Sequence, residues 1–189
     1  MRKLKLQMQI TVDGFVAGPE GQLDWMARDG SDQDLINFIV HLTDTSDTIL
    51  LGRKMTAGFV QYWEKAASQP DSPENPFAHK MVDTPKIVFS KTAKKVDGKN
   101  IRVENGDLVE AVNKLKRAAG KDIVVYGGAS FVSSLIRAGL IDEYNLFVNP
   151  VAIGNGMRIF DSRSGLTLFK STGYPSGVVV NRYNPSAPK

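Results

Sequence analysis

The stretch IVVYGGASFVSSLI, residues 123–136, decides the fold. Its first four residues form a continuous uncharged run, which is typical of a parallel strand covered on both faces. Gly127 and Gly128 then form a turn. The helix predicted after the turn is marked by apolar residues at helical spacing: Phe131, Val132, Leu135 and Ile136. Because missing side chains let a pyrophosphate approach backbone amides at the start of a helix, this unit is a candidate phosphate site.

A second unit of the same kind lies earlier in the chain. Residues 48–51 read as a short buried strand, Gly52-Arg53-Lys54 follow at once, and residues 55–65 read as a helix. The glycine permits a close turn, the helix N-terminal amides attract an anion, and two cations can flank a phosphate. An ordinary turn with solvated basic residues is the plainer alternative. We expect the two turns to face one shared groove, where each can bind a phosphate group of a nucleotide.

Neither of the best-known nucleotide motifs explains the later turn. Gly127-Gly128 lacks the G-x-G-x-x-G spacing of a standard Rossmann domain and has no Walker lysine after it. The sequence therefore predicts neither a standard Rossmann domain nor a P-loop ATPase.

Strands and helices alternate along the rest of the chain. Residues 4–12 alternate between apolar and polar side chains, which predicts a strand buried on one face. A helix is predicted from Ser31, its expected N-cap, to about residue 46. The other predicted strands lie at 86–89, 101–104, 143–148, 166–171 and 178–183, with a helix at 108–119 and a Pro-rich loop at 69–76. Alternating strands and helices predict a largely parallel sheet, and the helix-free end predicts antiparallel strands at one edge.

Composition indicates an ordinary soluble chain. Of its 189 residues, 42% are hydrophobic and 23% are charged, which suits one domain over residues 1–189 with a full core. The chain has no cysteine and only two histidines, so thiol chemistry and Cys- or multi-His metal sites are not expected.

The charge pattern argues against nucleic acid and membrane partners. The net charge is +4, but the basic residues are scattered and no basic patch with interleaved aromatics occurs. An anionic small ligand and a merely solvated basic surface both account for the excess. The apolar runs are too short to span a membrane, and the start of the chain lacks a signal-peptide core, so we expect a cytoplasmic protein.

An acidic residue is the candidate for substrate chemistry. Asp34 shares one helix flank with Phe38 and His41, and an acid beside an aromatic can hold a flat heterocycle and relay a proton to it. Charge pairing of an exposed Asp34 with the helix N-terminus is the plainer alternative. Asp24, next to Trp25, competes for the same role.

Five segments in order resemble the dihydrofolate reductase superfamily, and most closely its branch of riboflavin-biosynthesis pyrimidine reductases, the RibD C-terminal domain. The segments are residues 12–17 with Trp25 beyond them, 49–56, 87–91, 126–130 and 149–156. The last resembles the Pro-x-x-x-Gly-x-Gly segment of the pyrimidine reductases. The resemblance implies an α/β, dihydrofolate reductase-like three-layer fold, with a mixed, mostly parallel central sheet flanked by helices.

The resemblance also implies a function. The chain is expected to be an NADPH-dependent reductase that transfers hydride to a pteridine- or pyrimidine-type heterocycle or its ribosyl derivative. Asp34 is the expected catalytic residue, and Trp25 and Phe38 are expected to bind substrate. The expected cofactor-binding residues are Val16, Ala17, Gly52, Arg53, Lys54, Met55, Ser90, Lys91, Gly127, Gly128, Ala129, Ser130 and Phe131. The family further implies a homodimer and a cis peptide bond between Gly127 and Gly128.

The sequence departs from the family chiefly in its substrate region. Asp24 stands before Trp25 where folate reductases carry a proline, and the turn after Gly52 continues Lys54-Met55-Thr56 instead of a threonine and an aromatic. The longer substrate-phosphate segment of the pyrimidine reductases has no clear counterpart, and their fused deaminase domain is absent. Two other classes stay open: a non-catalytic nucleotide-binding module of the same fold, and an FMN-binding flavodoxin-type protein, although no Ser/Thr-rich phosphate loop follows the first strand.

Overall fold

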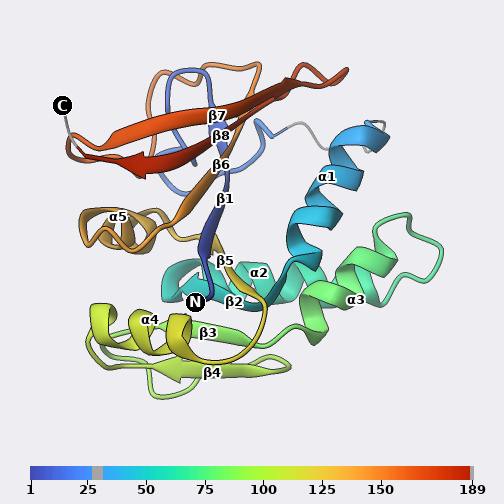
Figure 1. The fold of residues 1–189 in the computed structure, drawn as a ribbon. Helices are drawn as coiled ribbons and strands as arrows, with labels where there is room; N and C mark the ends of the chain where they lie inside the picture. Colours follow the sequence, from blue (N-terminus) through green and yellow to red (C-terminus); the bar gives the residue numbers. More distant parts are fainter. Residues whose placement is uncertain (27–31, 188–189) are drawn as a thin grey trace.

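A computed structural model describes residues 1–26 and 32–187. Its elements in chain order are β1 (Leu4–Thr11), α1 (Gln33–Asp44), β2 (Ser46–Gly52), α2 (Arg53–Ala67), α3 (Asn75–Asp83), β3 (Lys86–Phe89), β4 (Ile101–Glu104), α4 (Leu108–Arg117), β5 (Asp122–Gly127), α5 (Ala129–Arg137), β6 (Glu143–Asn149), β7 (Gly165–Gly173) and β8 (Val179–Ser186). The strands form one eight-stranded sheet in the order β4-β3-β2-β5-β1-β6-β8-β7 (Figure 1). None of these helices is long and apolar enough to cross a bilayer.

The sheet is mixed and mostly parallel, as predicted. β1 pairs in parallel with β5 and β6, and the parallel ladder continues through β2, β3 and β4. β8 pairs antiparallel with both β6 and β7, which confirms the predicted antiparallel edge.

Helices cover both faces of the sheet, which gives three layers (Figure 1). The larger core joins one face to α4 and α5 through Val112, Val132 and Leu135. On the opposite face, Met81 of α3 and the half-buried aromatics of α2 pack against β2, β3 and β5. α1 covers the same face further along, where its Leu42 contacts Phe147 of β6.

Each predicted strand is present, and the ends differ from the prediction by at most three residues. The predicted helices are also found, but α3 was missed because the Pro-rich segment 69–76 suggested a loop. α3 starts inside that segment at Asn75, and Pro76 lies at its beginning, where a missing N–H breaks no helical hydrogen bond. The predicted cap Ser31 lies outside the described residues. Asp32 caps α1, since its carboxylate accepts a hydrogen bond from the Leu35 amide at 3.1 Å.

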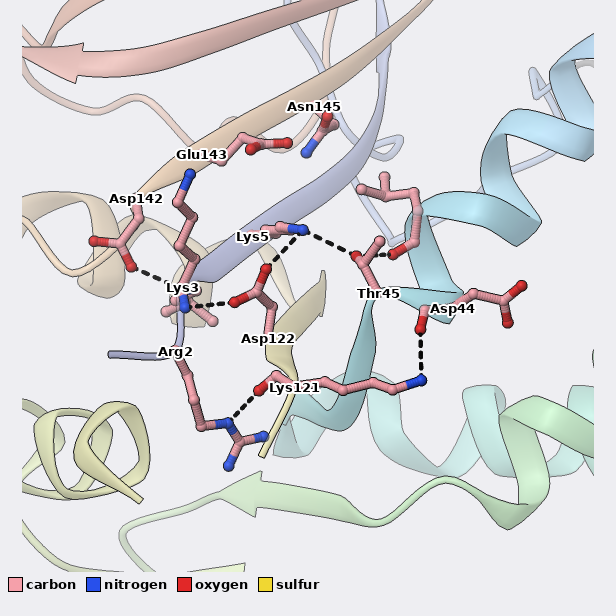
Figure 2. Close-up of polar contacts among 12 residues, drawn as sticks. Arg2, Lys3, Lys5, Asp44, Thr45, Lys121, Asp122, Asp142, Glu143 and Asn145 are labelled. Atoms are coloured by element: carbon pink, nitrogen blue, oxygen red, sulfur yellow. Dashed lines mark hydrogen bonds and ion pairs between the residues drawn. The ribbon is translucent and has the colours of Figure 1, made fainter. Parts of the chain in front are cut away.

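The prediction that β1 is buried on one face is wrong, because side chains on its second face are buried as well. Lys5 and Gln7, which the alternation assigned to solvent, are each only 8% exposed. The Lys5 ammonium lies 2.8 Å from Asp122 Oδ2 and donates to Thr45 Oγ1 at 2.9 Å (Figure 2). Burial of Lys5 is therefore compensated by partners from β5 and from the turn after α1.

Further ion pairs surround Lys5 at the amino ends of the parallel strands. Arg2 Nε donates to the Lys121 carbonyl (Figure 2), and its Nη2 pairs with Asp47. Burial opposes the charged form of Asp122, but hydrogen bonds from the Lys5 side chain and the Lys3 amide outweigh it, so the pKa of Asp122 lies below its usual value. This end of the sheet is a paired network, opposite the glycine turns.

Candidate cofactor and substrate site

The two predicted glycine turns lie side by side. Gly52 ends β2 and precedes α2, and Gly128 follows β5 and precedes α5. A methyl group built on Gly52 would lie 2.8 Å from Cβ of Phe131 and 3.4 Å from Cα of Gly128. Because β2 and β5 are neighbouring parallel strands, both turns lie at the same end of the sheet, where these strands have their carboxyl ends. The absence of a side chain at Gly52 lets the two turns touch.

Both helix starts at these turns lack a side-chain cap. Neither Gly52 nor Gly128 has a side chain to bond the first-turn amides of α2 or α5, whereas Asp32 and Asp107 cap α1 and α4. Uncapped first-turn N–H groups and the positive end of the helix dipole attract anions. Two such helix starts in contact can together bind a diphosphate.

Basic side chains lie next to these two helix starts. Arg53 and Lys54 occupy the first two positions of α2, and both are exposed. Lys91 is also exposed, after the end of β3. The preceding Ser90 closes its own turn, because its hydroxyl oxygen accepts hydrogen bonds from the amides of Thr92 and Ala93. The Ser90 hydroxyl therefore shapes the loop that carries Lys91.

The Gly127-Gly128 turn differs from the prediction in one respect. The described residues contain no cis peptide bond, so the expected cis bond between these glycines is wrong. The turn is made instead by positive φ angles of 148° at Gly127 and 56° at Gly128, which glycine adopts without a Cβ clash. The Gly128 amide donates to Sδ of Met55 at 2.8 Å. Met55 thus covers the turn, and a phosphate that used this amide would displace the thioether.

An aromatic pair borders the turns on the β3 side. The ring of Phe131, in the first turn of α5, stacks on Phe89 at the end of β3 with 5.0 Å between centroids. Ala129 and the exposed Ser130 precede it in the same helical turn. Phe131 therefore helps to fix the start of α5 against β2 and β3.

The loop after β1 is fixed to the segment 149–157. Val16 and Ala17 are buried, and they exchange two backbone hydrogen bonds of 2.8 Å with Met157. Asp13 Oδ2 accepts hydrogen bonds from the amides of Ile153 and Gly154. The hydrogen bond from the Thr11 hydroxyl, followed by those amides, holds the pKa of Asp13 below its usual value.

Sequence reasoning missed this role of Asp13. Its position directly after the first strand, before Gly14, was the available signal.

Asp34 and Phe38 lie on the flank of α1 that faces β6 and the turn between β7 and β8. The Phe38 ring lies 5.9 Å from Phe147 and 6.4 Å from Tyr174 between centroids. Asp34 is exposed one turn earlier on the same flank. The pKa of Tyr174 is raised mainly by burial, then by the negative charge of Asp32 and, to a smaller extent, by that of Asp34.

The opposite flank of α1 contacts the strand that leads to the glycine turn. Thr43 Oγ1 is hydrogen-bonded to the Tyr126 hydroxyl at 2.8 Å, and Tyr126 directly precedes Gly127. Burial raises the pKa of Tyr126, so its hydroxyl stays protonated. The structure thus brings Asp34 and Phe38 together, but on the flank away from Tyr126.

Asp24 and Trp25 lie near the start of the gap in the described chain. Asp24 is exposed, and Trp25 is half-buried. The Trp25 Nε1 atom is buried without a hydrogen-bond partner among the residues that the structure describes. The roles assigned to Asp34, Phe38, Asp24 and Trp25 stay predictions.

Known proteins resemble this chain over nearly its whole length. The model of the RibD C-terminal domain family matches residues 2–180. The uncharacterized protein YyaP of Bacillus subtilis (strain 168) is 37% identical over 187 residues, which cover 97% of this chain and 95% of that protein. A pyrimidine reductase-like protein from Corynebacterium diphtheriae has a similar structure, with a TM-score of 0.63, 15% identity and coverage of 98% of this chain and 92% of that one.

The dihydrofolate reductase of Enterococcus faecalis has a similar structure as well. Its TM-score is 0.61 at 15% identity, with coverage of 97% of this chain and 96% of that one. The mixed sheet and the two helical layers are therefore those of the dihydrofolate reductase-like fold. With a family model that matches from β1 into β8, the chain belongs to the RibD C-terminal domain family.

Proposed function

We propose that the chain is an NADPH-dependent reductase that transfers hydride to a pteridine- or pyrimidine-type heterocycle or to its ribosyl derivative. The observation that carries the proposal is the contact between the two uncapped helix starts at Gly52 and Gly128. Its support is twofold: this pair of helix starts suits a diphosphate, and the Enterococcus faecalis reductase of the same fold was solved with NADP(H) bound.

The residues of this chain suit the different parts of that cofactor. The first-turn amides of α5 would bind the pyrophosphate, with Met55 moved aside. Arg53 and Lys54 would bind the 2′-phosphate that distinguishes NADPH from NADH, and Lys91 adds charge there. The backbone around Val16 and Ala17 would lie near the nicotinamide. The bound cofactor supplies the hydride, and the chain positions it.

The proton that accompanies hydride transfer comes from Asp34 or from water. Asp34 is exposed and shares its flank of α1 with Phe38, whose ring lies against Tyr174, whereas Tyr126, just before the glycine turn, contacts the opposite flank. The exposure of Asp34 to solvent therefore favours water as the proton donor. Positioning of substrate and cofactor then accounts for most of the catalysis.

Cofactor binding is tested by thermal shift with NADPH and with NADH. We expect NADPH to raise Tm more than NADH does, and we expect Arg53→Ala with Lys54→Ala to abolish the difference. Lys65→Ala is the matched control, because Lys65 is exposed in the last turn of the same helix. Equal shifts with the two nucleotides would contradict the assignment of Arg53 and Lys54.

Turnover is tested by following NADPH oxidation with dihydrofolate, a ribosylaminopyrimidine phosphate and simple aldehydes. We expect oxidation with a heterocyclic substrate. NADPH binding without turnover would favour a non-catalytic nucleotide-binding module. Neither binding nor turnover would overturn the proposed function. The homodimer implied by the resemblance stays a prediction.

A further inference from the structure

A row of carboxamides lies on the face of β1 that also carries the buried Lys5. Gln7 and Gln9 are two residues apart on this central strand, so their side chains point to the same face of the sheet. The register places Gln7 beside Asn145 of β6, and Thr11 beside Asn149. The polar half of the β1 alternation therefore forms a buried polar floor instead of a solvated surface.

This row lies next to the paired-glycine turn. Leu6 pairs with Val125, so one step along both strands brings Gln7 beside Tyr126, the residue before Gly127. Met8, between the two glutamines, has its Cε 3.7 Å from the methyl position of Gly127. Gln7 and Gln9 thus lie just before and just after the level of the turn, on the face that α1 and α2 cover.

Gln7 and Gln9 each have an unpaired hydrogen-bonding group in the described structure, whereas the neighbouring Asn145 uses its amide both as donor and as acceptor. Asn145 donates to the Leu6 carbonyl and accepts from Arg182 Nε. Gln7 Oε1, by contrast, is inaccessible to solvent and has no hydrogen-bond partner in the described parts of the chain. A buried acceptor of this kind is destabilising unless a ligand or an ordered water binds it.

Gln9 is the complementary case. Its Oε1 accepts from Asn149 Nδ2 at 2.8 Å, which fixes the orientation of its carboxamide. Its Nε2 has no hydrogen-bond partner among residues 1–26 and 32–187, and the side chain is half-buried. The face therefore offers an unused acceptor at Gln7 and an unused donor at Gln9, and both groups are neutral.

We propose that Gln7 and Gln9 form the substrate-recognition pair and that they read the edge of a cyclic amide. A ring N–H donates to Gln7 Oε1, and the adjacent ring carbonyl accepts from Gln9 Nε2. This inference rests on the proposed function and narrows it: the substrate is a lactam-containing heterocycle, not a simple aldehyde. A site with a buried acceptor rejects a ligand that lacks the matching donor, because the acceptor is then left unpaired.

The test compares 5,6-diaminouracil with 5,6-diamino-1,3-dimethyluracil by titration calorimetry. The second compound keeps both carbonyls and has no ring N–H. Wild-type protein is expected to bind the first compound about 10-fold more tightly. Gln7→Met is expected to bind both with affinities within about 2-fold of each other, because the acceptor is gone, and Gln9→Met is expected to bind both about 10-fold more weakly. Gln33→Met, an exposed change on α1, is the control that leaves both affinities unchanged.

The outcomes separate this inference from the proposed function. Each titration is run with and without NADPH, and NADPH binding is measured on its own. NADPH binding with no preference between the two rings, or with no ring binding, overturns the recognition pair and leaves the reductase standing. Ring discrimination without NADPH binding supports the recognition pair and overturns the proposed NADPH-dependent reductase. A preference that persists in Gln7→Met also overturns the inference, and if that variant does not fold, the wild-type comparison and Gln9→Met decide.

Discussion

Gly52 and Phe131 approach so closely that a methyl group on Gly52 would lie 2.8 Å from Cβ of Phe131. Cβ atoms essentially never approach that closely, so any side chain at position 52 must push α5 away from β2. The same contact brings the starts of α2 and α5 together. We therefore expect both stability and the proposed cofactor binding to depend on one glycine.

Gly52→Ala is predicted to be destabilising and to weaken NADPH binding. Overpacking of a buried contact costs about 1–3 kcal/mol, and the displaced start of α5 no longer presents its amides beside those of α2. Urea unfolding and an NADPH titration measure the two effects. Gly58→Ala on the same helix is the control, because nothing lies within 4 Å of its methyl position. The control should stabilise the protein by up to about 1 kcal/mol. Unchanged NADPH affinity in Gly52→Ala would mean that the glycine contact does not shape the site.

Met55 is predicted to compete with the cofactor for the amide of Gly128. Met55→Leu keeps the volume but removes the sulfur acceptor, at a cost of less than about 1.5 kcal/mol in stability. NADPH should then bind a few-fold more tightly, because no N–H···S contact must be broken. A titration of the variant and of wild-type protein measures the ratio. Weaker binding in the variant would instead make the thioether a contact of the bound cofactor.

The sequence predicted well those features that depend on neighbouring residues. The apolar run of β5 and its glycine pair are local, and both are present in the structure. α3 was missed because the contacts that stabilise it are not local. Ala78 and Met81 are fully buried against other elements, and the composition of a Pro-rich segment does not reveal such contacts.

The buried polar face of β1 was missed for a similar reason. Lys5 has its partners Asp122 and Thr45 more than thirty residues away in sequence, so alternation alone assigned it to solvent. Helical spacing correctly put Asp34 and Phe38 on one flank, but which strands that flank faces is decided by the topology of the sheet.

Lys5→Met is predicted to destabilise the fold through Asp122. Removal of one partner of a fully buried ion pair costs about 3–5 kcal/mol, and the 26% exposure of the Asp122 side chain reduces this to about 1–3 kcal/mol. Chemical unfolding of the single variants and of Lys5→Met with Asp122→Asn gives the coupling energy. Additive effects of the two changes would contradict a direct interaction.

The same pair predicts acid sensitivity. The folded-state pKa of Asp122 lies below its unfolded value, so the stability it contributes is present above the unfolded pKa and is lost as the pH falls through the folded one. The free energy of unfolding should therefore fall with pH below about 4, and the fall should be smaller in Asp122→Asn. Equal acid profiles for the two proteins would rule out this contribution.

Asp34→Asn is predicted to leave turnover within a few-fold of wild type. Asp34 is exposed in the first turn of α1, where its charge complements the helix N-terminus for about 0.3–1 kcal/mol of stability. A positioned general acid contributes about 100-fold or more to the rate, so the two roles differ in size and in readout. Steady-state turnover with the best substrate and Tm are measured for Asp34→Asn and for Asp24→Asn, an exposed acid outside α1. A 100-fold loss confined to Asp34→Asn, with Tm unchanged, would make Asp34 the proton donor. The expected result is a small loss of stability with turnover retained. In that case water is the proton donor, and Gln7 and Gln9 of β1 are the part of the site that selects the ring.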